Sequence, residues 1–164
     1  MKTENVQVDT MEFINEMKLC FQARSENESF ARVAVAGFLT YLNPTIEEIE
    51  DIKTAVSEAV TNAIIHGYEE KGGKIRMSAV LEKDELEITI EDDGIGIEDV
   101  SKAMQPLFTT KPEGERSGMG FSFMEAFMDK VKVDSSLGNG TTVHMWKSFQ
   151  GNVLLQNKFF TGQV

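Results

Sequence analysis

The chain has 164 residues, and its 27 Asp and Glu side chains outnumber its 16 Lys and Arg, which gives a formal net charge of −11. This length suits one domain that buries a core without disulfides or metals, and the acidic balance argues against a nucleic-acid binder, which needs a basic surface. A single cysteine, Cys20, excludes a disulfide scaffold and a cysteine-rich zinc site. The sequence has neither a signal-peptide pattern nor an apolar run of about 20 residues, so we expect a soluble cytoplasmic protein that does not enter a membrane.

The N-terminal part of the chain predicts a strand and a helix. Residues 1–15 are polar and show no period, so we interpret them as an N-terminal leader to which no structure is assigned. Residues 17–22 alternate between polar and apolar, as in a half-buried strand. Ser25 and Glu28 have the spacing of a capping box and predict the start of a helix that ends near Pro44. Along one side this helix would carry Phe30, Val33, Ala34, Gly37, Phe38 and Tyr41.

A longer helix is predicted next. Thr45 and Glu48 form a second capping box, and the helical pattern runs from there to about His66. Gly67 occupies the position of a C-terminal capping glycine. The residues expected to face inward are Ile49, Ile52, Val56, Ala59, Val60 and Ala63.

From residue 74 onward the apolar pattern changes from helical to alternating. The predicted elements are strands over 74–81 and 85–91, a short helix near 98–104, a mobile loop over 105–117, a helix over 118–130, and a hairpin of strands over 131–135 and 141–147. Helices gathered beside a largely antiparallel sheet predict an α+β protein, a two-layer α/β sandwich.

The long helix carries the first group of side chains with useful chemistry. Glu58 and Asn62 are four residues apart and therefore point from the same side, and His66 continues that line. The ordinary explanation of such a pair is a polar stripe on an amphipathic helix. Small and apolar neighbours favour another, in which the carboxylate and the amide oxygen hold a hydrated metal and polarise a hydroxyl.

A second group, Asp92-Asp93-Gly94-Ile95-Gly96, follows the strand over 85–91. Asp-Gly at the end of a strand is commonly only a turn. Gly94 and Gly96 also allow the backbone to approach a flat ligand, and Asp92 could accept a hydrogen bond from an amino group such as that of adenine. A cation bound by Asp92 and Asp93 is the other possibility, although the spacing does not match a calcium loop.

A third group, Arg116-Ser117-Gly118-Met119-Gly120, opens the helix over 118–130. Backbone N–H groups at a glycine-rich helix N-terminus can bind anions, and Arg116 would add positive charge. The alternative is a glycine-rich start of an ordinary packed helix. The chain lacks the P-loop motif and the motifs of eukaryotic-type protein kinases.

These three groups, followed by Gly138-Asn139-Gly140-Thr141-Thr142, resemble in their order the motifs of the GHKL superfamily of ATP-binding proteins (gyrase, Hsp90, histidine kinase and MutL type). The resemblance implies the Bergerat ATP-binding fold. Within the superfamily, segments 27–33, 57–68, 105–112 and 115–121 are similar to the anti-sigma F factor family, the serine kinases of endospore formers. The resemblance covers residues 16–147, so we expect an ATP-binding kinase domain over 16–149 and a C-terminal tail without assigned role over 150–164.

The resemblance implies a role for each matching residue. Glu58 would be the general base on a serine hydroxyl, Asn62 the ligand of Mg²⁺, and Asp92 the acceptor for the adenine amino group of ATP. Arg32 would lie near the partner surface, and residues 105–117 would form a lid over the triphosphate. The remaining residues expected to bind ATP are His66, Gly94, Gly96, Thr109, Thr110, Lys111, Arg116, Ser117, Gly118, Met119, Gly120 and Thr142.

The implied protein is a homodimeric anti-sigma factor that inhibits sigma F, a sporulation sigma factor, and uses ATP to phosphorylate its anti-anti-sigma antagonist on serine. Three alternatives stand beside it. A general-stress anti-sigma kinase of the same family would differ in its sigma partner, and a nucleotide-dependent binding module would lack the kinase step. A two-component histidine kinase would need a phosphoacceptor histidine on a dimerisation helix, a position that neither His66 nor His144 occupies.

Overall fold

The computed structural model describes residues 13–106 and 119–149. Most of the expected leader, most of the expected lid and the C-terminal tail lie outside these ranges. In chain order the elements are β1 Phe13–Gln22, α1 Ser25–Leu39, the 3-10 turn η1 Thr40–Leu42, α2 Ile46–Asn62, the π-helical turn η2 Ala63–Gly67, β2 Lys74–Glu82, β3 Glu85–Asp92, α3 Val100–Ala103, α4 Gly120–Phe127, β4 Lys130–Ser135 and β5 Thr141–Ser148.

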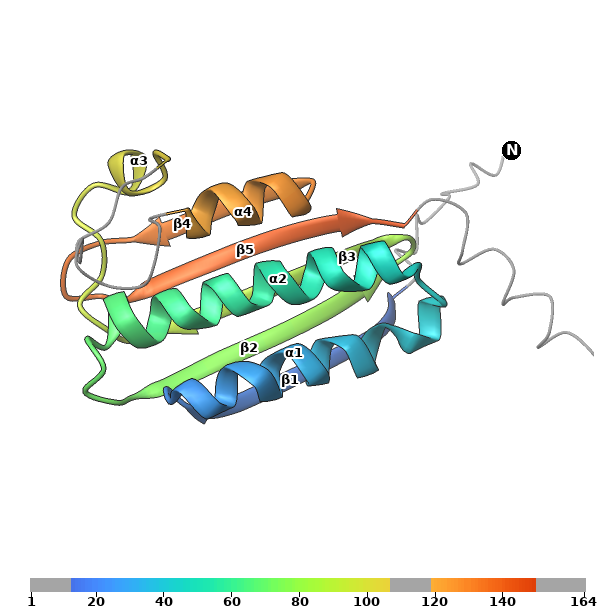
Figure 1. Ribbon diagram of the computed structural model, residues 1–164, viewed down its shortest axis with the longest axis horizontal. Coiled ribbons are helices and arrows are strands. Elements are labelled where there is room, and N and C mark those ends of the chain that lie inside the picture. Colours follow the sequence, from blue (N-terminus) through green and yellow to red (C-terminus); the bar gives the residue numbers. More distant parts are fainter. Residues whose placement is uncertain (1–12, 107–118, 150–164) are drawn as a thin grey trace, which may run out of the picture.

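The fold has two layers, as the sequence predicts. The strands form one five-stranded sheet in the order β1-β2-β3-β5-β4, and each neighbouring pair is antiparallel. Helices α1, α2 and α4 lie over one face of this sheet (Figure 1). The expected α+β sandwich is therefore confirmed.

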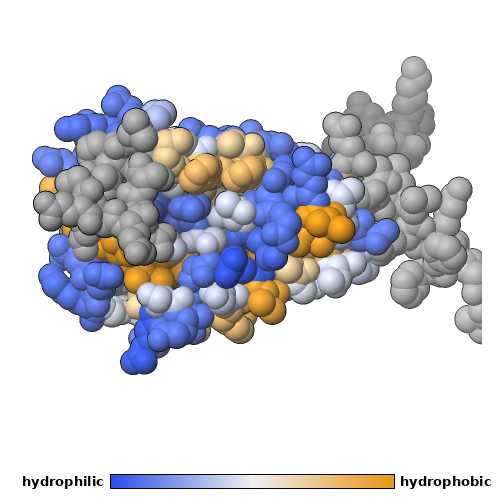
Figure 2. All heavy atoms as spheres, in the orientation of Figure 1, coloured by the Kyte–Doolittle hydropathy of each residue, from blue (hydrophilic) through white to orange (hydrophobic). Residues whose placement is uncertain are grey.

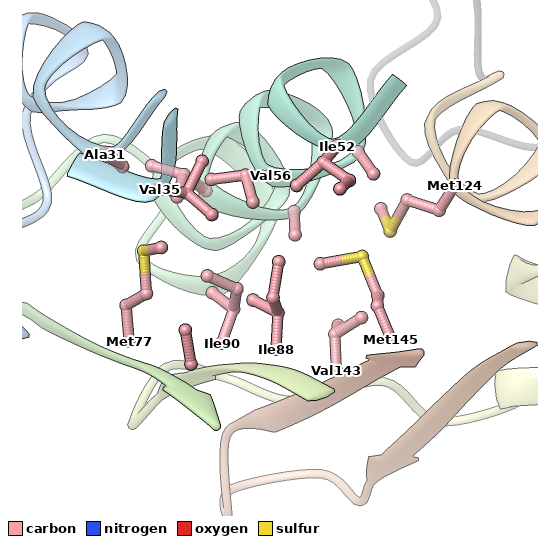
Figure 3. Close-up of a cluster of buried hydrophobic side chains, with 14 of the residues drawn as sticks. Ala31, Val35, Ile52, Val56, Met77, Ile88, Ile90, Met124, Val143 and Met145 are labelled. Atoms are coloured by element: carbon pink, nitrogen blue, oxygen red, sulfur yellow. The ribbon is translucent and has the colours of Figure 1, made fainter. Parts of the chain in front are cut away.

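The core lies between the helices and the sheet. Leu86, Ile88 and Ile90 alternate along β3 with more exposed residues, so the strand presents one apolar face. From α2, Ile52 and Val56 point toward this face, as Figure 3 shows, and both are buried. Removal of these side chains from water stabilises the packing of helix on sheet. Of the α2 residues expected to face inward, only Ile49 is not fully buried.

The two predicted capping boxes have different outcomes. At α2, Thr45 Oγ1 accepts from the N–H of Glu48 at 3.1 Å, and Glu48 Oε2 accepts from the N–H of Thr45 at 2.7 Å, so this box is confirmed. At α1 the prediction was wrong, because Ser25 is already helical and the N-cap is Arg24. Within the described residues Arg24 makes no side-chain cap hydrogen bond, and Glu28 contacts other side chains instead.

Those other contacts of Glu28 join two helices. Its carboxylate accepts a hydrogen bond from the Ser57 hydroxyl of α2. The same oxygen, Oε1, lies 2.8 Å from Nε of Arg32, one turn further along α1. One carboxylate on α1 therefore connects Arg32 to the α2 residue that precedes Glu58.

The apolar residues that the sequence analysis placed along one side of α1 are only partly buried. Ala31, Val35 and Leu39 are the buried residues of this helix, whereas Phe30 and Val33 are 48% and 70% exposed. Figure 2 shows hydrophobic patches on the helix-covered face of the molecule, between hydrophilic areas. Phe30 and Val33 therefore lie at the surface, whereas Phe38 of the same set packs against the core.

The end of the long helix also differs from the prediction. Gly67 lies inside η2 and is absent from the positive-φ glycines of the described chain, so it is no left-handed cap. The chain instead widens into a π-helical turn, in which the N–H of Tyr68 donates to the carbonyl of Ala63 at 2.9 Å. The left-handed conformations follow at Glu69 and Glu70.

Across the described ranges, the helices are too short or too polar to cross a bilayer.

Candidate nucleotide site

A cleft of about 1070 Å³ opens where α2 and η2 meet the ends of β3 and β5. Its walls also come from α3, from the start of α4 and from Leu137 of the β4–β5 connection. Six of the residues expected to bind ATP line it: Asn62, His66, Asp92, Gly96, Met119 and Gly120. Glu58 lines the same cleft.

Glu58 and Asn62 converge on the first residue of α4. A Cβ built on Gly120 would lie 3.1 Å from Glu58 Oε2 and 3.2 Å from both terminal atoms of Asn62. The helical spacing of four places the two side chains on one side of α2, and the absence of a side chain at Gly120 leaves room for both. A carboxylate and an amide oxygen therefore lie together at the wall of the cleft, where they can accept a proton and hold a cation.

Asp92 ends β3 and is buried at the back of the cleft, with 7% of its surface exposed. Burial raises the pKa of its carboxyl above the ordinary value, and hydrogen bonds from the N–H groups of Gly94 and Thr141 partly offset this effect. The bond from the Gly94 N–H to Oδ1 is 2.9 Å long. A buried acceptor held by the backbone in this way can select a ligand that offers a donor.

Two glycines permit this position of Asp92. A Cβ on Gly67 would lie 2.8 Å from Asp92 Oδ1, and a Cβ on Gly94 would lie 2.1 Å from the carbonyl oxygen of Gly67. Neither distance is sterically acceptable, so η2 and the turn after β3 can approach only through glycine. The N–H of Ile95 donates to the same Gly67 oxygen at 2.9 Å and joins the two segments.

The hairpin of β4 and β5 supports the turn from the other side. The carbonyl of Ile95 accepts from the N–H of Gly138 at 2.7 Å, and the N–H of Ile97 donates to Ser135 Oγ at 2.8 Å. Gly96 lies between these bonds with a φ of 75°. Hydrogen bonds therefore join segments that are far apart in sequence, such as Ile97 and Ser135, which are separated by 38 positions.

Comparison with known proteins assigns the chain to a family. Residues 21–147 match the family described as histidine kinase-like ATPase domain. The anti-sigma F factor of Clostridium acetobutylicum is 62% identical over 135 residues, which cover 82% of this chain and 94% of that protein. The anti-sigma F factor of Bacillus licheniformis is 56% identical over 144 residues, 87% of this chain and 99% of that protein. The chain belongs to the anti-sigma F factor family.

Solved structures agree on the fold of this anti-sigma F factor family member. The RsbU and RsbW domains of a Mycobacterium tuberculosis protein superpose with a TM-score of 0.57 at 17% identity, over 82% of this chain and 32% of that chain. The catalytic domain of the histidine kinase ThkA gives a TM-score of 0.50 at 19% identity. The match covers 82% of this chain and 96% of that domain's chain. Membership of an ATPase-domain family implies that the chain binds ATP.

The remaining predicted site residues fall into three groups. Gly94 lies behind the cleft wall, against Gly67, and Arg32 lies on α1, away from the residues that line the cleft. Thr142 is paired with Glu91 and Asp134 in the sheet, and among the described residues it is Thr141 that lines the cleft. Outside the described residues lie Thr109, Thr110, Lys111, Arg116, Ser117 and Gly118.

Sequence reasoning missed a set of apolar residues in the cleft. Ile90 and Val143 come from the inward faces of β3 and β5, and Ile95 and Leu137 stand at the rim, both about half exposed. The alternation of β5 was the available signal, because Val143 and Met145 must face inward and Thr141 shares their face. Apolar walls with a few well-placed polar groups are typical of sites that bind small molecules.

Proposed function

We propose that this chain is an ATP-dependent anti-sigma kinase. It binds ATP with Mg²⁺ in the cleft, transfers the γ-phosphate to a serine of an anti-anti-sigma protein, and binds a sporulation sigma factor of the sigma F type. The observation that carries the proposal is the convergence of Glu58 and Asn62 at Gly120, in the same cleft as the buried Asp92. Its relatives named anti-sigma F factor support the choice of a sigma factor as a partner.

Asp92 is proposed to recognise the base. Its carboxylate is an acceptor, so it pairs with the exocyclic amino group of adenine and disfavours a base that carries a carbonyl oxygen at that position. Ile90, Ile95 and Val143 supply apolar surface for the two faces of the ring. Gly67 and Gly94 keep the carboxylate in place from behind.

Glu58 is proposed to act as the general base. A half-buried carboxylate at the cleft wall accepts the proton of the substrate serine as the hydroxyl oxygen forms its bond to phosphorus. Asn62, one turn further along α2, would hold Mg²⁺, which neutralises phosphate charge when bound. One protein ligand suffices for this ion, because phosphates and water commonly fill its other positions.

The partner surface is proposed to lie on α1. Arg32 is 39% exposed in its side chain, and the same turn of α1 also carries the exposed Phe30 and Val33. A cation beside apolar side chains can anchor a protein partner. The protein is proposed to act as a homodimer in the cytoplasm, and light scattering of the purified chain tests its mass.

One experiment tests the proposal as a whole. The purified chain is incubated with γ-labelled ATP and Mg²⁺, together with candidate sigma factors and candidate anti-anti-sigma proteins. Label on a serine of an anti-anti-sigma protein, with retention of a sigma factor on the immobilised chain, supports the proposal. ATP binding and sigma retention without label would leave a nucleotide-dependent binding module, and retention of a general-stress sigma factor alone would change the assigned partner.

A further inference from the structure

A charged pair on the open face of the sheet lies directly behind the turn that follows Asp92. Arg76 is flanked along β2 by the buried Ile75 and Met77, so its side chain lies on the face that the helices do not cover. Its guanidinium donates to both carboxylate oxygens of Asp93, at 2.7 and 2.9 Å. A third bond, of 3.0 Å, runs from Nε to Glu91.

The backbone of Asp93 is held as well. Its N–H donates to the hydroxyl oxygen of Tyr68 at 2.9 Å, and that hydroxyl donates in turn to the carbonyl of Lys74. The Tyr68 ring packs over Gly73, where a Cβ would lie 2.2 Å from the ring. Asp93 is therefore held at two points. Arg76 of β2 binds its side chain, and Tyr68, which follows η2, accepts from its backbone N–H.

Asp93 is the middle residue of a tight turn. Asp92 precedes it, Gly94 follows it, and the Gly94 N–H donates to the Asp92 carboxylate at 2.9 Å. Any rotation of the Asp93 backbone would move this N–H and redirect the Asp92 carboxylate. We propose that Arg76 and Tyr68 are positioning residues for adenine recognition, which fix Asp93 and with it the turn that presents Asp92 to the base.

This inference rests on the proposed ATP site and adds two residues, Arg76 and Tyr68, that are not among the residues lining the cleft. The pair is half exposed, with 44% of the Arg76 side chain accessible, so its contribution to global stability is small. The two parallel hydrogen bonds from the Arg76 guanidinium fix the orientation of the Asp93 carboxylate, which a single hydrogen bond from a lysine would not do. Consistently, Arg76 holds the pKa of Asp93 below its ordinary value.

The first test compares nucleotides that differ at the base. In Arg76→Met we expect ATP affinity to fall about 3- to 10-fold, the scale of one partly screened charged hydrogen-bond pair. Affinity for ITP, whose base has a carbonyl oxygen in place of the amino group, should change less, so the ratio of ATP to ITP affinity falls. Arg76→Lys should lie between the wild type and Arg76→Met. Lys132→Met is the matched control, since Lys132 pairs with Asp134 at 2.7 Å on the same strand β4.

The second test needs no nucleotide. Amide hydrogen exchange of the full chain should become faster over residues 92–95 in Arg76→Met and in Tyr68→Phe, while the centre of β2 and β3 keeps its protection. Unchanged exchange in both variants overturns the proposal. An equal loss of ATP and ITP affinity also overturns it, because that result indicates general damage to the site. If the wild-type chain binds no ATP, the proposed function fails, and the exchange result still decides whether Arg76 and Tyr68 hold the turn.

Discussion

The carboxylate of Asp92 lies against Gly67, so closely that a Cβ at Gly67 would come within 2.8 Å of Oδ1. The acid that is proposed to read adenine is therefore supported by a residue that has no side chain. The glycine also lies within the π-helical turn η2, whose backbone carries the carbonyl that accepts from Ile95.

Gly67→Ala should consequently damage both the fold and the site. The added methyl group must displace Asp92, and overpacking of this kind costs on the order of 1–3 kcal/mol. We expect a lower free energy of unfolding and weaker ATP binding, measured by urea denaturation and calorimetry. Gly37→Ala is the control, because a Cβ there meets no described atom within 4 Å and the residue lies in α1. That change should stabilise the protein by about 0.5–1 kcal/mol, and equal effects of the two substitutions would contradict the packing argument.

The titration of Asp92 should be visible in stability. Burial raises the pKa of its carboxyl above about 3.8, the ordinary value. In the pH interval just above 3.8, the folded chain therefore retains a proton that the unfolded chain has lost. The free energy of unfolding contributed by this group therefore falls as pH rises through the folded-state pKa. Asp92→Asn removes this dependence, so the difference between wild type and variant should shrink or change sign from about pH 4 to about pH 7 in urea-unfolding series. If the curves of unfolding free energy against pH run parallel for the wild type and Asp92→Asn, the pH dependence arises from another group.

The same variant should bind ATP more weakly. An amide in place of the carboxylate loses a charge-assisted acceptor, at a cost on the order of 1–3 kcal/mol in ATP affinity. Calorimetric titration with ATP measures the loss. Equal affinity in wild type and Asp92→Asn would move the adenine contact to another residue.

Glu58→Gln separates catalysis from binding. Glutamine keeps the size of the side chain but cannot take a proton, so phosphorylation of the partner should fall about 10²–10⁴-fold. Nucleotide affinity and retention of the sigma partner should change little, because Asp92 and α1 are intact. Transfer at the wild-type rate would make Glu58 structural, whereas lost nucleotide binding would show that it organises the site.

Lys147→Met tests stability far from the cleft. Lys147 Nζ donates to the carbonyl of Phe127 at 2.7 Å and lies 3.4 Å from Asp51, with both side chains mostly buried. Loss of the cation leaves these acceptors unpaired, and we expect destabilisation on the order of 1–3 kcal/mol. ATP affinity below the melting transition should stay at the wild-type value. If Lys147→Met also lowers the affinity for ATP, the Lys147 end of the sheet and the cleft are not independent.

Much of the fold follows from local patterns in the sequence. Alternation in β3 and the capping box at Thr45 are decided by neighbours within a few residues, so both could be predicted. The box at Ser25 failed because Glu28 finds long-range partners, among them Ser57 of α2, that a local pattern does not contain.

The site was predictable only in part for the same reason. Glu58 and Asn62 share a helix face, and their spacing alone brings them together. The motif that contains Thr142 does not state which face of β5 is turned inward, so it could not indicate that Thr141 lines the cleft. The pairing of Arg76 with Asp93 depends on the register of β2 against β3, in which Arg76 lies opposite Glu91.

The carboxylate that Glu28 shares between Arg32 and Ser57 has a thermodynamic consequence. It joins the proposed partner helix to the helix that carries Glu58, so a partner and a nucleotide would bind to two helices that this carboxylate connects. Linkage between two ligands is reciprocal. If ATP raises the affinity of a partner through this bridge by some factor, the partner must raise the affinity of ATP by the same factor. A bound sigma factor would then tighten the binding of the nucleotide, and loss of either ligand would weaken the binding of the other.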